Sequence, residues 1–253
     1  FIEIGENRKA LKHLQNLAEL HIEEKNLEDA QKVLQKILTI QPDDINTMNQ
    51  LADIYGELGY ENEMVETYER MSALYLEKEA FNKVIEICSE ILKLRPQNIT
   101  GHERLIDVYE QTNRPDEAVN FLFELADIYQ EKEDLEKEQE CYERILKKDN
   151  ANMKARRRQI FLLLKLSHKQ AAYREARILS DQYTMRQDIG EAVDLYRKLV
   201  QQSPEDIPLH LHLLELYKKA ERNDDVIQEL ERIIDLYEKR DEKAVAVDYY
   251  KDL

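Results

Sequence analysis

The chain has 253 residues, of which 42% are apolar and 36% charged, with only five glycines, five prolines and no tryptophan. This composition favours helices, and the net charge of −16 argues against general nucleic-acid binding, because an acidic surface repels phosphate. The longest apolar run in the predicted core, Ile160 to Leu164, is far shorter than the roughly 20 residues of a membrane span, so we expect no membrane insertion in this segment.

Apolar residues recur at spacings of three and four along the chain, which is typical of one face of an α-helix. The first two helices are expected at residues 7–25 and 27–40, and Pro42 ends the second. Residues 45–98 then form a unit of three helices. The first of these ends at Gly56 to Gly59, and the third ends before Pro96.

The same pattern returns every 54 residues. Residues 99–152 and 153–206 repeat the unit, while residues 1–44 and 207–253 hold partial copies. One tyrosine column runs through the copies, and its members are Tyr75, Tyr129, Tyr183 and Tyr237, with His21 in the first copy. The pattern predicts about fourteen helices with short connections, as antiparallel neighbours require. We expect residues 1–253 to form a single array.

These residues resemble the tetratricopeptide repeat, a 34-residue helix-turn-helix. The resemblance rests on Tyr68, Met71, Ser72, Tyr75, Val84, Cys88, Ile91 and Pro96, and again on Ala176, Leu179, Ser180, Tyr183, Ala192, Tyr196, Leu199 and Pro204. It implies an all-α, right-handed α-solenoid of antiparallel helices. It also implies a scaffold that binds a protein or peptide partner on its surface.

The chain departs from this family in its period, which is a 34-residue repeat plus 20 residues. The middle helix of each three-helix unit therefore matches both the second helix of one two-helix repeat and the first helix of the next two-helix repeat. In a two-layer solenoid, an odd number of helices would place equivalent helices of adjacent units in opposite layers. The other possibility is that one helix is displaced outward.

The sequence offers no constellation for catalysis. His102 and His210 share the column of Met48, so we interpret them as part of the repeat. No phosphate loop, Gly-x-Ser-x-Gly or paired-cysteine motif occurs. We predict that the chain is not an enzyme and has no catalytic, cofactor-binding or metal-binding residue.

One unit differs from the others in charge. Residues 153–206 carry 11 Lys and Arg against 7 Asp and Glu, and they follow a unit with 7 against 15. Within this basic unit, Arg156, Gln159 and Phe161 break the repeat pattern, and function tends to be found where local rules fail. We predict a basic patch with an aromatic anchor that binds an acidic peptide or protein. Its members are Lys154, Arg157, Arg158, Phe161 and Lys165, with Arg174 and Arg177. The alternative is that Phe161 belongs to the core and the arginines neutralise the acidic neighbour.

A second interpretation of the whole chain is a structural one, as a segment of a longer array or of a self-associating complex. The chain starts at Phe1, which indicates a fragment, and Leu253 falls in the core column of Ile91 and Ile145. Family members that grip a carboxylate use Lys and Asn on successive first helices, where this chain has Asn49 and Asp53, then Glu103 and Asp107. Because Asp and Glu would repel a carboxylate, that role is disfavoured. Two cysteines favour a reducing compartment only weakly, and on that basis we expect a cytoplasmic protein.

Overall fold

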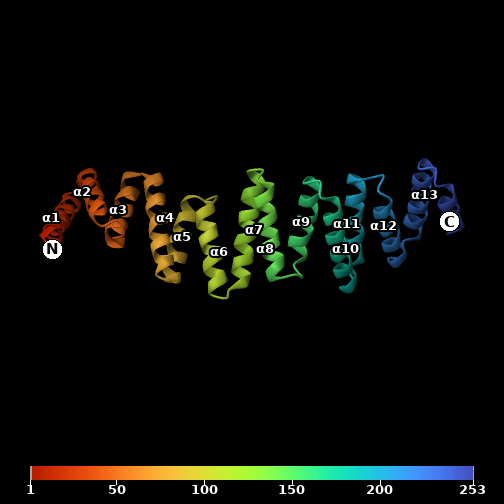
Figure 1. The fold of residues 1–253 in the computed structure, drawn as a ribbon, viewed down its shortest axis with the longest axis horizontal. Helices are drawn as coiled ribbons and strands as arrows, with labels where there is room; N and C mark the ends of the chain where they lie inside the picture. Colours follow the sequence, from red (N-terminus) through yellow and green to blue (C-terminus); the bar gives the residue numbers. More distant parts are fainter. Residues whose placement is uncertain (1, 253) are drawn as a thin grey trace. The chain divides into compact units, whose positions relative to one another are not determined.

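The computed structural model describes residues 2–252, and the side chains of residues 8–251. Residues 2–252 form fourteen α-helices joined by short connections (Figure 1). Their bounds are α1 Ile2–Glu23, α2 Leu27–Ile40, α3 Ile45–Leu58, α4 Glu61–Glu77, α5 Phe81–Leu94, α6 Ile99–Gln111, α7 Pro115–Glu131, α8 Leu135–Lys148, α9 Met153–Lys165, α10 Lys169–Met185, α11 Ile189–Gln202, α12 Ile207–Lys219, α13 Asn223–Lys239 and α14 Lys243–Asp252. The all-α fold is therefore confirmed. Leu253 lies outside the described residues.

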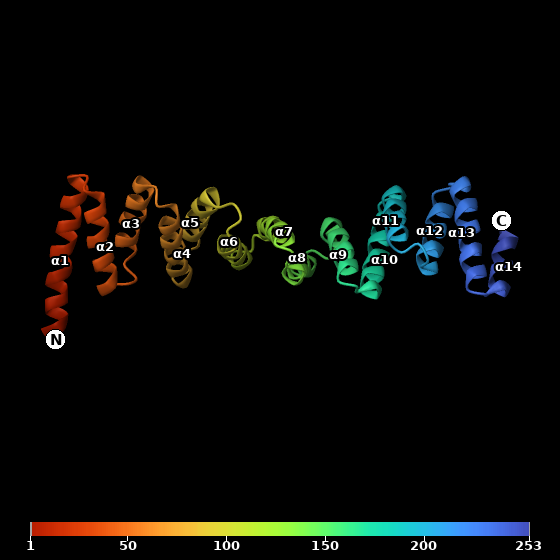
Figure 2. The same cartoon turned by 90° about the horizontal axis from the view of Figure 1, so that it is seen from above.

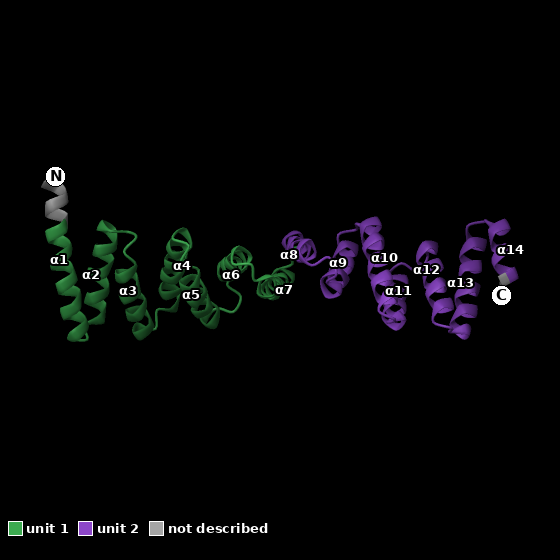
Figure 3. Ribbon diagram, turned by 90° about the horizontal axis from the view of Figure 1, so that it is seen from below, with its two compact units in different colours: residues 1–134 green, residues 135–253 purple. Residues whose placement is uncertain are grey.

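The chain divides into two compact units, residues 1–134 with α1 to α7 and residues 135–253 with α8 to α14 (Figure 3). Within each unit, every helix packs against the next one in the chain (Figure 2). The continuity of one array over residues 1–253 stays a prediction. Among the described residues, no helix is both long enough and apolar enough to span a bilayer.

Equivalent helices begin at a constant spacing in the structure. The helices α3, α6, α9 and α12 begin at Ile45, Ile99, Met153 and Ile207, which are 54 residues apart. A polar side chain caps the first three of these helices. Asp44, Asn98 and Asn152 accept a hydrogen bond from a backbone N–H of the first turn. These caps follow directly from the Asp and Asn that precede each helix.

Two kinds of connection follow the helices in a fixed order. A residue with φ between 53° and 73° follows the first and the second helix of each 54-residue repeat unit. These residues are Lys25, Gly59, Glu79, Asn113, Glu133, Ser167, Gln187, Glu221 and Asp241. Each lies just after a helix end, where a left-handed residue lets backbone N–H groups return to the last carbonyls. The third helix of each unit is followed instead by a turn with Pro42, Pro96, Asn150 or Pro204, and the residues of these turns have negative φ. The middle helix is thus flanked on both sides by the same left-handed turn.

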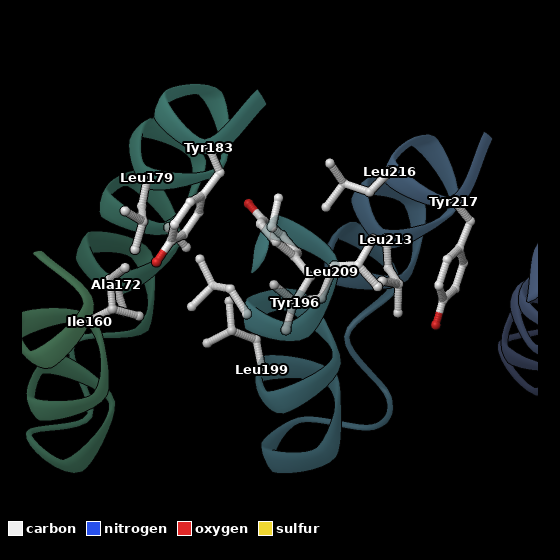
Figure 4. Close-up of a cluster of buried hydrophobic side chains, with 14 of the residues drawn as sticks. Ile160, Ala172, Leu179, Tyr183, Tyr196, Leu199, Leu209, Leu213, Leu216 and Tyr217 are labelled. Carbon is white, nitrogen blue, oxygen red and sulfur yellow. The ribbon is translucent and has the colours of Figure 1, made fainter. Parts of the chain in front are cut away.

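The core consists of the predicted apolar columns. In residues 135–253, one cluster joins side chains from α9, α10, α11 and α12 (Figure 4). Tyr183 and Tyr196 pack within it and are 8% and 3% exposed. Because this cluster draws on four successive helices, each helix depends on its neighbours to bury its apolar face.

Contacts between a helix and the second helix after it in the chain show in which layer each helix of a repeat unit lies. Arg157 of α9 pairs with Glu191 of α11 at 2.6 Å, and Ser180 of α10 lies 3.2 Å from the His212 ring of α12. The helices α9 and α11 therefore lie in one row, and α10 and α12 lie in the other. Since α9 and α12 are equivalent helices of adjacent repeats, equivalent helices lie in opposite layers here. This is the first of the two arrangements that the odd helix count allowed.

Candidate partner-binding surface

Arg156, which breaks the repeat pattern, is a buried packing residue. Its side chain is 3% exposed, and Nη2 donates to the Asn150 carbonyl at 2.7 Å. Nη1 forms an ion pair with Glu175 on α10. Arg156 thus joins the turn before α9 to the helix after it, and it takes no part in a surface patch.

His210 makes the same bridge 54 residues later. Its Nε2 lies 2.9 Å from the Pro204 carbonyl oxygen and its Nδ1 lies 2.5 Å from Glu229 Oε1 on α13. Burial lowers the pKa of His210, but hydrogen bonds with Glu229 and Pro204 outweigh burial and hold the pKa above its usual value. Both ring nitrogens face acceptors, so the protonated ring is the form that satisfies both.

His102 occupies the same column in residues 1–134. Its Nδ1 lies 2.9 Å from the Asn98 carbonyl oxygen, and its Nε2 lies 3.3 Å from Glu124 Oε2 on α7. The column of Met48 therefore holds a buried cationic or polar bridge in three of its four copies. This supports the interpretation of His102 and His210 as parts of the repeat.

Two of the predicted patch residues contact their own chain. Arg157 pairs with Glu191 and lies 3.4 Å from the Tyr183 hydroxyl. Arg158 forms a hydrogen bond with Tyr142, although burial still raises the pKa of that phenol to about 12. Both arginines are half-buried. Arg157 and Arg158 therefore both make contacts within the chain, and the acid with which Arg157 pairs belongs to its own repeat unit and not to the acidic neighbour.

Phe161 also lies against the core. It is half-buried and packs on the cluster of α9 to α12, as the alternative interpretation expected. Gln159 is buried too, at 7% exposure, where the other copies have leucine. Neither side chain presents itself on the surface as an anchor for a partner.

The remaining four residues of the prediction are exposed: Lys154 and Lys165 on α9, and Arg174 and Arg177 on α10. The structure does not bring all seven predicted residues into one surface. Partner binding by these four residues stays a prediction.

Two exposed apolar residues on α10 escaped the sequence analysis. Ile178 is 41% exposed and Met185 is 85% exposed. The sequence did carry a signal for them, because the equivalent positions in α4, α7 and α13 hold charged residues. These positions are Arg70, Glu124 and Arg232 for Ile178, and Glu77, Glu131 and Lys239 for Met185.

The described residues contain no group of three or more His, Cys, Asp or Glu side chains that could hold a metal ion. Cys88 is buried, and burial raises the pKa of its thiol to about 11. Such a thiol is protonated at neutral pH and is a poor nucleophile.

Comparison with known proteins gives two matching family models, both described as tetratricopeptide repeat. One matches residues 13–44, 45–75 and 119–152, and the other matches residues 183–246. The comparison with curated proteins found no match.

Solved structures resemble the chain only distantly. The apo form of RapI is 9% identical over 96% of this chain and 95% of its own, with a TM-score of 0.38. MamA from Desulfovibrio magneticus is 14% identical over 91% and 97%, with a TM-score of 0.25. A thermophilic TPR protein of Thermus thermophilus is 17% identical over 61% and 99%, with a TM-score of 0.23.

Proposed function

This chain belongs to the tetratricopeptide repeat family, and we propose that it is a non-catalytic scaffold that binds an acidic protein or peptide through its basic repeat unit, residues 153–206. Repeats of this kind present extended helical surfaces on which partners bind. The observation that carries the proposal is the reversal of charge in one unit. Lys154, Lys165, Arg174 and Arg177 are exposed in a chain whose net charge is −16.

Electrostatics would set the selectivity of such a scaffold. An isolated basic surface on an acidic chain attracts acidic partners, while the rest of the surface repels them. The partner would therefore be confined to one repeat unit. Contacts to exposed charges are individually weak, so affinity would also need apolar contacts.

The test begins by purifying the tagged full chain from the cells that produce it. A co-purified protein is identified by mass spectrometry, prepared separately, and its binding to the purified full chain is measured. We expect the double variant Lys165→Glu, Arg174→Glu to bind the partner at least about tenfold more weakly. The matched control is Glu57→Lys with Glu66→Arg, at the same columns of residues 45–98, and it should leave binding nearly unchanged.

The outcomes separate the parts of the proposal. If no protein binds the purified chain directly, the scaffold function is wrong. If a partner binds and both double variants weaken it equally, the chain is a scaffold but its basic unit is not the site.

One observation favours the structural interpretation as a second candidate. Leu17 and Leu20 on α1 are 41% and 49% exposed, whereas Met71 and Leu125, the equivalents of Leu17, are 1% and 2% exposed. A second helix on this face of α1 would bury the two leucines, as happens at the equivalent positions. Sedimentation velocity over a range of concentrations tests this candidate, since a strict monomer at every concentration would remove self-association through α1.

A further inference from the structure

The exposed side of α10 carries a stripe of basic and apolar residues that Asp181 interrupts. Arg174, Arg177, Ile178 and Met185 are all exposed, and Asp181 lies among them. At 100° per residue these positions fall within about 100° of the helix circumference. The stripe extends about 16 Å along the helix axis. We call Arg174, Arg177, Ile178 and Met185 the α10 surface.

The helices equivalent to α10 have a different character at the same four positions. In α4 the equivalent residues are Glu66, Glu69, Arg70 and Glu77, and in α13 they are Gln228, Glu231, Arg232 and Lys239. In α7 they are Asn120, Phe123, Glu124 and Glu131, of which Phe123 is buried. Three acidic residues of α4 are thus replaced by two arginines and a methionine. The inward positions of α10 keep the repeat pattern, since Ala176, Leu179 and Tyr183 are buried in the shared core. Ile178 and Met185 stand at exposed positions whose columns hold only charged residues in α4, α7 and α13, so packing of α10 against its neighbours does not explain these two residues.

The two apolar residues of the α10 surface are seven residues apart, which is two turns of helix and about 10 Å. A partner helix with apolar residues at i and i+7 has the same spacing. The flanking arginines would pair with carboxylates beside that apolar stripe, and Asp181 would repel a carboxylate placed over the middle of the surface. Charge complementarity therefore selects a helix with an apolar seam and acidic residues on the side that faces the two arginines.

We infer that the α10 surface is the docking site for an acidic amphipathic helix of a partner protein. This inference rests on the proposed scaffold function and names the face and the chemistry of the partner. Ile178 and Met185 would supply the apolar contacts, and Arg174 and Arg177 would fix the partner's orientation. The roles differ from those of Arg157 and Arg158, whose side chains bind within the chain.

The probe is a synthetic helical peptide of about 18 residues with leucines at i, i+3, i+4 and i+7 and glutamates on both flanks. Its binding to the full chain is measured by fluorescence anisotropy. A matched peptide carries lysine in place of each glutamate. We expect the acidic peptide to bind about tenfold more tightly than the lysine peptide, and the preference to fall as salt is added.

Two variants that restore repeat residues test the site. Arg174→Glu with Arg177→Glu removes the basic residues, and Ile178→Arg with Met185→Glu removes the apolar ones. Each new residue already occupies the same column in α4, so both variants should keep the native helix content by circular dichroism. We expect each pair to weaken the acidic peptide about tenfold.

Three results would overturn the inference: equal binding of the two peptides, unchanged binding to both folded variants, or a loss of self-association in the variants that reveals a second copy as the occupant. Failure of the peptide test together with a partner that binds the full chain would leave the scaffold function intact and move its site elsewhere.

Discussion

Removing the cationic side chain of Arg156 should destabilise the helices around it strongly. Arg156 is 3% exposed, and it forms an ion pair with Glu175, which is 28% exposed. Arg156→Met would leave the Glu175 carboxylate and the Asn150 carbonyl without their buried donor. Loss of one partner of a buried ion pair costs about 3–5 kcal/mol. We expect about 3 kcal/mol, at the lower end of this range, because water still reaches part of Glu175.

The repeat itself supplies the compensating change. Residues 45–98 have Met48 and Thr67 in the columns of Arg156 and Glu175, and both are buried. Arg156→Met combined with Glu175→Thr removes both charges and should recover to within about 1 kcal/mol of the parent chain. The coupling energy of this double-mutant cycle should reach about 2 kcal/mol or more.

The assay is native-state hydrogen exchange of the α9 and α10 amides, supported by urea unfolding. Local exchange is preferred because repeat proteins do not always unfold in one step. Additive effects of the two substitutions, with no recovery in the double variant, would refute the buried bridge as the reason that Arg156 departs from the repeat.

Three further predictions concern other parts of the chain. The pKa of His210 is raised in the folded protein, so the contribution of His210 to the free energy of unfolding is fully present below the unfolded pKa of about 6.5 and is lost as pH rises through the folded pKa. The urea midpoint of the parent chain should therefore fall with rising pH relative to that of His210→Arg, a variant that copies Arg156. Parallel pH profiles of the two chains would contradict this. Glu79 has φ 53°, so Glu79→Gly should stabilise the folded chain by about 0.5–1 kcal/mol, while Gly59→Ala at φ 73° should destabilise it by about 1 kcal/mol in thermal unfolding. A destabilising Glu79→Gly together with a stabilising Gly59→Ala would contradict the left-handed turns. Cys88 should react with a thiol reagent at pH 8 only after unfolding, because burial raises its pKa to about 11, and rapid labelling of the folded chain would contradict its burial.

Much of the fold could be read from the sequence because each helix places its apolar residues on one face. Leu34, Leu105 and Leu179 are buried as their spacing predicted. The turn residues were equally informative, since Pro96 and Asn98 mark the end of one helix and the cap of the next. These are local signals, and local physics sets them.

The alternation of layers could not be read in the same way. It depends on which helices pack two places apart, as Arg157 and Glu191 show for α9 and α11. The residues in one column of the repeat indicate only that this position packs against a neighbouring helix. They do not indicate in which layer of the solenoid that neighbouring helix lies.

The candidate site shows the same limit. A run of arginines at 156 to 158 indicates positive charge, but only contacts reveal that Arg156 is buried and Arg157 is paired. Exposed Ile178 and Met185 carried a readable signal, because charged residues occupy their columns in α4, α7 and α13. Such a departure is visible only when exposed columns are compared as carefully as buried ones.

The central claim is that the basic unit, and α10 within it, contacts a partner protein. The most direct measurement places a photo-cross-linking amino acid at Arg174 and, in a separate chain, at Glu66, which is its equivalent in residues 45–98. Both positions are exposed on equivalent helices. We predict cross-links to another protein from position 174 at several times the yield from position 66. Equal yields from the two positions, or cross-links from position 66 alone, would contradict the claim.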